Sequence, residues 1–374
     1  MRMVTRVLAL AATALLWSLA CGGSEGQLTP TPSPTVTSPP ITAKGRIAFI
    51  TPDGRLALIE PNGTNLTPIT DAGVQAFQWS PDGSLIAVQT SAGTDTMVRV
   101  IRPDGQAVFE VPGSAPLWSP AGDHLAVTQG QDVSVVDTAG QETLRVAGGA
   151  RPVWSPDGSA LAVLKVGPDG LGVPVIINVA TGEEAPLSPG IEPSKPDYPI
   201  AWHPAGNVIA YQKTVYDLTN GTTQDLPGTA VEWNPDGRML MVTLEYVPQD
   251  RATPARLLDF TQGGKQVIGL DVRLAADETP AWLEIKKWTD WTPDGRYLIY
   301  MDPLSYNTRV RIYDTVGISQ RKWPRLAGER PQVSPDGTHM TFMFRGRIWV
   351  LALDRSAMRD IADGGYPAWQ PVTS

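Results

Sequence analysis

The sequence predicts an all-β fold built from one repeated hairpin unit, and three observations support this prediction. Glycine and proline are abundant, with 36 and 35 in 374 residues, while only 18% of residues are charged, which suits many short strands joined by tight turns. A motif that begins with tryptophan recurs at intervals of roughly forty residues, and an alternating strand pattern recurs with it. Together they predict a single β-propeller of eight four-stranded blades, with seven blades as the alternative.

The N-terminus has the features of an export signal. Arg2 and Arg6 give it a positive start, Val7–Leu16 is almost wholly apolar, and the run ends with Ala20 before Cys21. About fourteen apolar residues are too few to span a bilayer. The ending resembles a bacterial lipobox, which implies a lipoprotein signal peptide over residues 1–20 and a lipid on Cys21, the only cysteine. The alternative is an ordinary secretory signal in which Cys21 is incidental.

Residues 21–44 are predicted to be a disordered linker. They consist mainly of glycine, serine, threonine and proline, and such a tract buries too little apolar surface to offset its chain entropy. The stretch Gly22–Gly26 formally matches the G-x-S-x-G nucleophile elbow, but the strand and helix that this motif requires are not predicted on either side. The folded domain is therefore expected over residues 45–374.

The tryptophan motif has the form Trp-x-Pro-x-Gly. Its copies begin at Trp79, Trp118, Trp154, Trp202, Trp233 and Trp291, with Val333 replacing tryptophan in a seventh copy and Trp369 starting an incomplete eighth. Proline sets the first corner of a turn and glycine accepts the left-handed conformation that returns the chain as a hairpin. We expect these seven tryptophans to be buried between blades, where each would remove about 150–250 Å² from water.

The second repeated element is an alternating apolar strand downstream of each hairpin. Its eight copies are Leu56–Ile59, Val98–Ile101, Val133–Val136, Val175–Ile177, Val215–Asp217, Leu257–Asp259, Val310–Tyr313 and Ile348–Leu351. The first unit, at Arg46–Ile50, lacks a tryptophan strand before it, whereas Trp369 lacks a strand after it. Pairing these two terminal strands would close the ring and leave no open sheet edge.

The hairpin W-[ST]-P-D-G-x-x-[LI]-A-[VY] resembles the TolB-type propeller repeat, which is related in shape to WD repeats. The resemblance covers Gly45–Ser374 and implies architecture rather than function. TolB itself has six blades and a separate N-terminal α/β domain, so its role in an envelope complex cannot be carried over to this chain.

No recognisable catalytic or metal-binding motif is present in the sequence. His124, His203 and His339 fall in or beside the repeated turns, where a structural role is favoured, and turn chemistry explains the aspartates of the Pro-Asp-Gly turns. The sequence contains no calcium loop, H-E-x-x-H motif, phosphate loop or cysteine cluster. We therefore expect no cofactor, no metal and no enzymatic activity. The alternative is a propeller hydrolase or lyase that uses scattered carboxylates on an extracellular polymer.

The order of strands predicts where a ligand binds. The turns between first and second strands and between third and fourth strands should share one face, called here the turn face, and the other connections should form the opposite loop face. The longest connections, Gly167–Gly172, Pro189–Pro199, Glu245–Pro254 and Asp271–Lys287, all belong to the loop face. Their aromatic and charged residues are the candidate binding residues: Tyr198, Tyr246, Trp282, Lys286, Lys287 and Trp288. Alternatively, Trp282 and Trp288 only pack the insertion onto its blade.

Charge narrows the class of partner. The net charge is −8, and removal of a signal peptide containing Arg2 and Arg6 would make it more negative, which disfavours nucleic acids and anionic lipid surfaces. The sequence thus predicts a monomeric, non-catalytic scaffold that binds a protein, peptide or glycan. It would contact the bacterial cell membrane only through its lipid anchor, with the propeller outside the cytoplasm.

Overall fold

The computed structural model describes residues 40–372 except 93–94, 190, 195–197, 245–254, 271–288, 302–309, 318 and 323–327. The chain divides into two units, Met1–Thr37 and Ser38–Ser374, and every described residue belongs to the second. The predicted signal peptide, Cys21 and most of the predicted linker lie outside the described residues. Ile41 is buried in an apolar cluster with Ile47 and Trp369, so part of the segment expected to be linker packs onto the folded unit.

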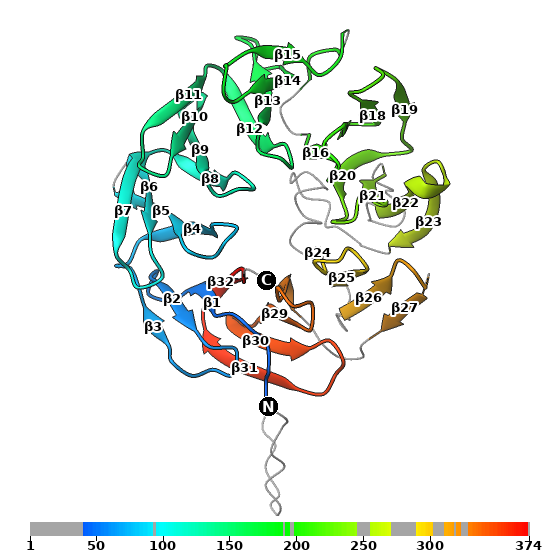
Figure 1. The fold of residues 1–374 in the computed structure, drawn as a ribbon. Helices are drawn as coiled ribbons and strands as arrows, with labels where there is room; N and C mark the ends of the chain where they lie inside the picture. Colours follow the sequence, from blue (N-terminus) through cyan, green and yellow to red (C-terminus); the bar gives the residue numbers. More distant parts are fainter. Residues whose placement is uncertain are drawn as a thin grey trace, which may run out of the picture. The chain divides into compact units, whose positions relative to one another are not determined.

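The second unit is an all-β propeller of eight four-stranded antiparallel sheets, which confirms the predicted fold class (Figure 1). Blade 1 combines β32 (Gly365–Trp369) with β1 (Ile47–Ile50), β2 (Leu56–Ile59) and β3 (Thr67–Pro68). Blade 2 contains β4 (Val74–Trp79), β5 (Ile86–Ala92), β6 (Asp95–Ile101) and β7 (Ala107–Pro112). Blade 3 contains β8 (Ser114–Trp118), β9 (His124–Gln129), β10 (Asp132–Asp137) and β11 (Glu142–Val146). Blade 4 contains β12 (Gly149–Trp154), β13 (Ala160–Val166), β14 (Gly172–Asn178) and β15 (Glu184–Pro186).

The remaining four blades follow in the same order. Blade 5 contains β16 (Ile200–Trp202), β17 (Val208–Tyr211), β18 (Thr214–Asp217) and β19 (Thr223–Asp225). Blade 6 contains β20 (Thr229–Trp233), β21 (Met239–Thr243), β22 (Ala255–Asp259), the short 3₁₀ helix η1 (Phe260–Gln262) and β23 (Lys265–Leu270). Blade 7 contains β24 (Thr289–Trp291), β25 (Tyr297–Met301), β26 (Val310–Asp314) and β27 (Ser319–Lys322). Blade 8 contains β28 (Glu329–Val333), β29 (His339–Phe344), β30 (Arg347–Ala352) and β31 (Met358–Asp363).

Both open questions about the ring are settled by the strand pairing. The short unit after Trp202 forms its own sheet, β16 to β19, so the blade count is eight and not seven. Strand β1 pairs with β32 in antiparallel register, with Ile47 opposite Trp369 and Ala48 opposite Ala368. The ring is therefore closed by its terminal strands, as the sequence predicted.

The repeated tryptophans join neighbouring blades through a recurring hydrogen bond. In five copies the indole Nε1 donates to the backbone carbonyl that precedes the motif of the previous blade. An example is the bond from Trp154 to the Leu117 oxygen at 3.1 Å, and Trp79, Trp118, Trp233 and Trp369 make the equivalent bond. A buried indole thus gains both apolar contact and a partner for its only donor.

Trp202 corrects the prediction that all seven tryptophans are core residues. Six are buried, but Trp202 is only half-buried, and its Nε1 donates to Gly206 O of its own turn at 2.9 Å. The glycines of most other turns are close to the preceding blade: a Cβ atom added at Gly158 would lie 3.7 Å from Cδ of Pro120. A Cβ atom at Gly206 would meet nothing within 4 Å. The seam between blades 4 and 5 therefore lacks both contacts that recur between other blades.

A loop provides other contacts at this seam. Gly172 in blade 4 and Ser194 in the loop before β16 exchange two backbone hydrogen bonds, of 2.7 and 3.0 Å. The Ser194 hydroxyl also accepts a hydrogen bond from Gln212 Nε2 at 2.7 Å and lies 3.1 Å from the Tyr211 hydroxyl, and both of these residues belong to the blade 5 side of the seam. Through Ser194, the connection between β15 and β16 thus links blade 5 to blade 4.

Candidate functional site

Only one of the six predicted binding residues lies in the described part of the chain. Tyr198 is half-buried and packs edge-on against Tyr211, with ring centroids 6.4 Å apart. The other five, Tyr246, Trp282, Lys286, Lys287 and Trp288, lie outside the described residues, and the structure does not test them as ligand contacts. Tyr198 lies in the same connection between β15 and β16 as Ser194, and its packing against Tyr211 accounts for its position.

The antiparallel sheets define the two faces as predicted. The first strand of each blade ends at the Trp-x-Pro-x-Gly turn, so its other end lies on the loop face. In Figure 1 the labelled first strands β4, β8, β12, β16, β20, β24 and β32 lie toward the middle of the ring and the fourth strands lie toward its rim. The N-terminal ends of the first strands therefore surround the axis of the ring on the loop face, and this region is called here the loop-face mouth.

These inner strand ends have a feature that the sequence analysis missed. In blades 1, 2, 3, 4, 6 and 8, the register between the first and second strands shifts by one residue, which marks a β-bulge. At four of these bulges a residue other than glycine has a positive φ: Ala115 (50°), Arg151 (52°), Arg330 (54°) and Tyr366 (56°). Each of these strained conformations costs about 1–3 kcal/mol and persists only where the surrounding structure enforces it.

Proline follows each of the four strained residues. Its missing N–H and fixed φ suit an edge strand at a bulge, where a ladder hydrogen bond is not needed. The pattern x-Pro-x-Trp, or x-Pro-x-Val in blade 8, could therefore have predicted these four bulges from the sequence. It occurs as Ala115–Trp118, Arg151–Trp154, Arg330–Val333 and Tyr366–Trp369.

Two of the strained residues meet across the seam between blades 8 and 1. The Arg330 guanidinium carbon lies 4.2 Å from the centroid of the Tyr366 ring, within the range of a cation–π contact. Arg330 is half-buried and Tyr366 is 48% exposed. The backbone N–H of Tyr366 contacts Met343 Sδ at 3.1 Å, which helps to fix the bulge. The pair therefore places a charged and an aromatic group at the loop-face mouth.

A polar chain occupies the same face between blades 2 and 3. Gln89 Nε2 donates to Gln75 Oε1 at 3.0 Å, and Gln89 Oε1 accepts from the strained Ala115 N–H at 2.8 Å. These amides orient one another, so the mouth is polar and ordered on this side as well.

Two grooves open on the loop face, one between blades 2 and 3 and the other between blades 3 and 4. Their volumes are about 550 and 370 Å³, and both are bordered by Thr128 and Gly130. Glycines contribute much of their walls, including Gly113, Gly148 and Gly149. None of the residues that line the two grooves is aromatic, and Asp95 is the one charged residue among them.

The three histidines lie on the turn face and have structural surroundings. His203 Nδ1 accepts from the Ala205 N–H at 3.0 Å while Nε2 lies 2.9 Å from Gly237 O, so Nε2 carries the proton and donates to the next blade. His339 is buried, and burial lowers the pKa of its imidazole. His124 lies beside Asp123, with Nδ1 3.1 Å from its carboxylate. Two further grooves open on this face, one lined by His203 and the other by His339.

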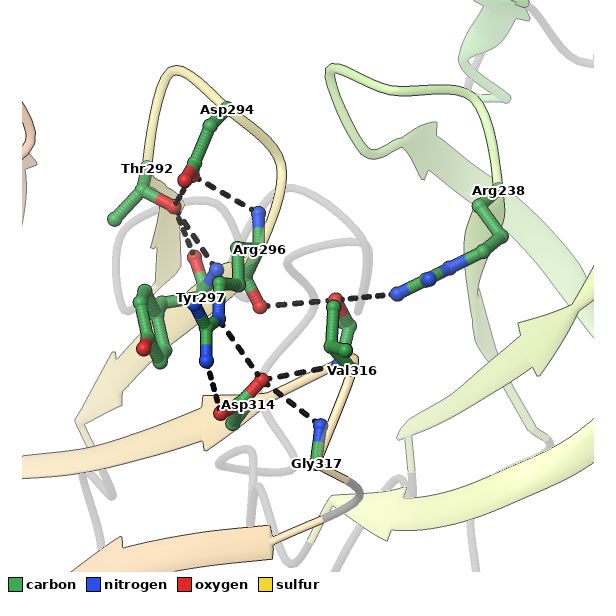
Figure 2. A network of polar contacts seen from close by, with 9 residues as sticks. Arg238, Thr292, Asp294, Arg296, Tyr297, Asp314, Val316 and Gly317 are labelled. Carbon is green, nitrogen blue, oxygen red and sulfur yellow. Dashed lines mark hydrogen bonds and ion pairs between the residues drawn. The ribbon is translucent and has the colours of Figure 1, made fainter.

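A polar network also links blades 6 and 7 on the turn face (Figure 2). Arg238 Nη2 donates to Thr315 Oγ1 at 2.7 Å, and this hydroxyl donates to Arg296 O at 2.9 Å. Arg296 pairs with Asp314 at 3.2 Å, and Asp314 also accepts the N–H groups of Val316 and Gly317. These bonds link Arg238 of blade 6 to Thr315 and Arg296 of blade 7, and we assign the network a structural role.

The described residues contain no group of three or more histidine, cysteine, aspartate or glutamate side chains arranged to hold a metal ion. Within the same part of the chain, no helix is long and apolar enough to cross a membrane.

Comparison with known proteins shows the fold. No model of a known protein family and no curated protein matches the sequence. Among solved structures, a eukaryotic initiation factor matches with 14% identity over 88% of this chain and 99% of its own, at a TM-score of 0.54. An oligogalacturonate lyase in complex with manganese matches with 13% identity over 86% of each chain, at a TM-score of 0.48. TolB from Acinetobacter baumannii matches with 14% identity over 75% of this chain and 81% of its own, at a TM-score of 0.37. The eight-bladed β-propeller predicted from the hairpin repeat is the fold of this chain, and at such identities the likeness to these proteins is one of fold alone.

Proposed function

We propose that this protein is an exported, lipid-anchored and non-catalytic scaffold that binds a protein or peptide partner on its loop face. The observation that carries the proposal is the set of strained bulges at the loop-face mouth, because backbone strain that the fold maintains tends to be found at functional sites. Arg330 and Tyr366 provide there the residue types that dominate binding energy at protein interfaces.

The position of the chain ends supports this orientation. Strand β1 begins on the turn face and β32 ends there, because a second strand starts, and a first strand ends, at the Trp-x-Pro-x-Gly turn. Pro40 and Thr42 line a turn-face groove with Asp336 and His339. A tether that leads from Cys21 to Pro40 would therefore join the propeller on the turn face and leave the loop face accessible.

Selective blocking of one face tests the proposal. A fragment of residues 40–374 lacks Cys21 and so contains no cysteine. Gln131→Cys places a thiol on the loop face, in the turn between β9 and β10, and Thr219→Cys places one on the turn face, between β18 and β19; both positions are exposed. Each variant is coupled to a polyethylene glycol maleimide and used to capture partners from an envelope extract.

We expect the loop-face adduct to lose the partner that the uncoupled fragment captures and the turn-face adduct to retain it. Equal capture by both adducts would place the partner elsewhere and reject the proposal. Capture of a polysaccharide in place of a protein would reassign the ligand class, and turnover of that polysaccharide would favour the alternative of a hydrolase or lyase.

The anchor has a separate test. Growth with radiolabelled palmitate should label the full-length chain, and Cys21→Ser should abolish the label while the protein is still exported. Export without labelling of the unaltered chain would support the ordinary secretory signal.

A further inference from the structure

Arg330 contacts an aromatic ring, whereas several arginines on the surface of this acidic chain pair with carboxylates. Arg55, Arg99, Arg145 and Arg347 each pair with a carboxylate, at 3.0, 2.9, 2.6 and 2.6 Å. Within the described residues, Arg330 has no carboxylate within 4.0 Å and contacts the Tyr366 ring. Arg102 and Arg359 also lack a carboxylate partner there, but they bond to Gln106 and to the Asn62 carbonyl. Arg330 is half-buried at the loop-face mouth, so in a chain of net charge −8 its guanidinium is available to an acidic ligand.

The contact with Tyr366 prepares the guanidinium for a carboxylate. A guanidinium that stacks on an aromatic ring uses its face, and its N–H groups project from its edge in a planar fork that matches two carboxylate oxygens. Because Arg330 is half-buried, a bond made there is weakened less by water than one made at a fully exposed arginine. The strained backbone at φ 54° and 56° fixes both side chains before a ligand arrives, which lowers the entropy cost of binding.

The surroundings indicate a peptide as the bearer of the carboxylate. The two loop-face grooves are lined mainly by glycines and by small or polar side chains such as Thr128, which leaves room for an extended chain. They lack the aromatic side chains on which a sugar ring would stack, and the Tyr366 ring at the mouth already contacts Arg330. A second cation, Arg345, lies exposed in the loop-face turn of blade 8, and its guanidinium is 5.1 Å from the Phe344 ring. Two cations beside one seam favour a segment with more than one acidic residue.

We infer that Arg330, supported by Tyr366, forms a carboxylate-binding subsite at the loop-face mouth and that its ligand is an extended acidic peptide segment of the partner. The inference rests on the proposed function, since it assigns the chemistry of the partner bound at that face.

The test uses the full chain and two fluorescein-labelled octapeptides, one alternating glutamate with alanine and the other with glutamine in place of every glutamate. Fluorescence anisotropy at low salt should show at least about tenfold tighter binding of the glutamate peptide, because one charge-assisted bidentate contact contributes that much. Arg330→Ala should remove this preference. Arg330→Lys should keep only part of it, because lysine retains the charge without the planar fork.

The matched control is Arg102→Ala. Arg102 is an exposed arginine at the turn-face end of β6, and its loss changes net charge by the same amount without touching the mouth. Tyr366→Phe should leave binding unchanged, since it keeps the ring, whereas Tyr366→Ala should weaken binding several-fold. Circular dichroism and the melting temperature of each variant verify that the propeller remains folded.

Three results would each overturn the inference: no preference of the unaltered chain for glutamate, an equal loss from Arg330→Ala and Arg102→Ala, or full binding by the Arg330→Ala variant. Any of these can occur while the face-blocking experiment still succeeds, and then only the carboxylate subsite is rejected. If the loop-face adduct retains the partner, the proposed function itself is rejected.

Discussion

Replacing Trp154 by alanine tests whether the tryptophan motif stabilises the ring through contact between blades. The Trp154 side chain is 7% exposed and packs with Ala126 and Val135 of blade 3 and Leu161 of blade 4, while its indole donates to Leu117 O at 3.1 Å. Truncation of a buried tryptophan leaves a large cavity and costs about 3–5 kcal/mol. Loss of the indole donor also removes the hydrogen bond to that carbonyl. We expect Trp154→Ala to reduce the free energy of unfolding by this amount.

Trp202→Ala is the matched control within the same chain. Trp202 occupies the same position in the motif, but it is half-buried and its indole bonds to Gly206 in its own turn. Its truncation should cost less than about 2 kcal/mol, because less apolar area returns to water and no bond between blades is lost. Equilibrium urea unfolding followed by far-ultraviolet circular dichroism measures both variants. Equal destabilisation by the two substitutions would refute the argument that contact across the seam, and not tryptophan itself, stabilises the ring.

Three further predictions follow from the turns and the weak seam. Hydrogen bonding from Ser155 lowers the pKa of the Asp157 carboxyl in the folded protein. The stability that this carboxylate contributes is therefore complete above the ordinary aspartate pKa of about 4, and it is lost as pH falls through the lower pKa of the folded state. The urea midpoint should be constant from neutral pH to about pH 5 and then fall, and it should fall less steeply in Asp157→Asn. Gly237→Ala should destabilise the propeller more than Gly170→Ala. Both glycines have φ 75°, but only at Gly237 would an added Cβ lie 2.5 Å from His203 Nε2. The melting temperatures of the two variants measure the difference, and equal shifts would exclude the clash. Amide hydrogens of β16 and β17 should exchange faster than those of β12 and β13 in hydrogen-exchange mass spectrometry, and uniform exchange would show that the loop contacts fully replace the missing ones.

The architecture was predictable because its signals are local and repeated. A Trp-x-Pro-x-Gly turn is defined by the conformations of proline and glycine, and Gly83, Gly158 and Gly295 have positive φ values of 69°, 73° and 69° as the turn requires. The closure of β1 on β32 followed from counting which strands lacked partners. The environment of Trp202 was not predictable in the same way, because it depends on the contact that its particular blade makes with blade 4.

The candidate site was only partly accessible from sequence. The turn and loop faces followed from strand alternation, but the loops were ranked by length and aromatic content, which led to Tyr198 and to residues outside the described part of the chain. The signal that was missed is proline two residues before the motif's first position, since proline inside a strand pattern indicates an edge or a bulge. Arg330 and Tyr366 both stand immediately before this proline in neighbouring blades, so the repeat itself brings them together although they are far apart in sequence.

The seam between blades 4 and 5 shows why loop length alone is a weak indicator of binding. The connection Pro189–Pro199 is long, yet its described part makes the Ser194 contacts to Gly172, Gln212 and Tyr211 that hold this seam. The Ser194 contacts therefore replace the hydrogen bond to the previous blade that Trp202 does not make. Strain at Arg330 and Tyr366 has no comparable structural role, because blades 2 and 6 contain a bulge at the corresponding place without a strained residue other than glycine, and β17 pairs with β16 without a bulge. Features that cost stability without supporting the ring are the stronger guide to function, and for this reason we propose the loop-face mouth as the binding site.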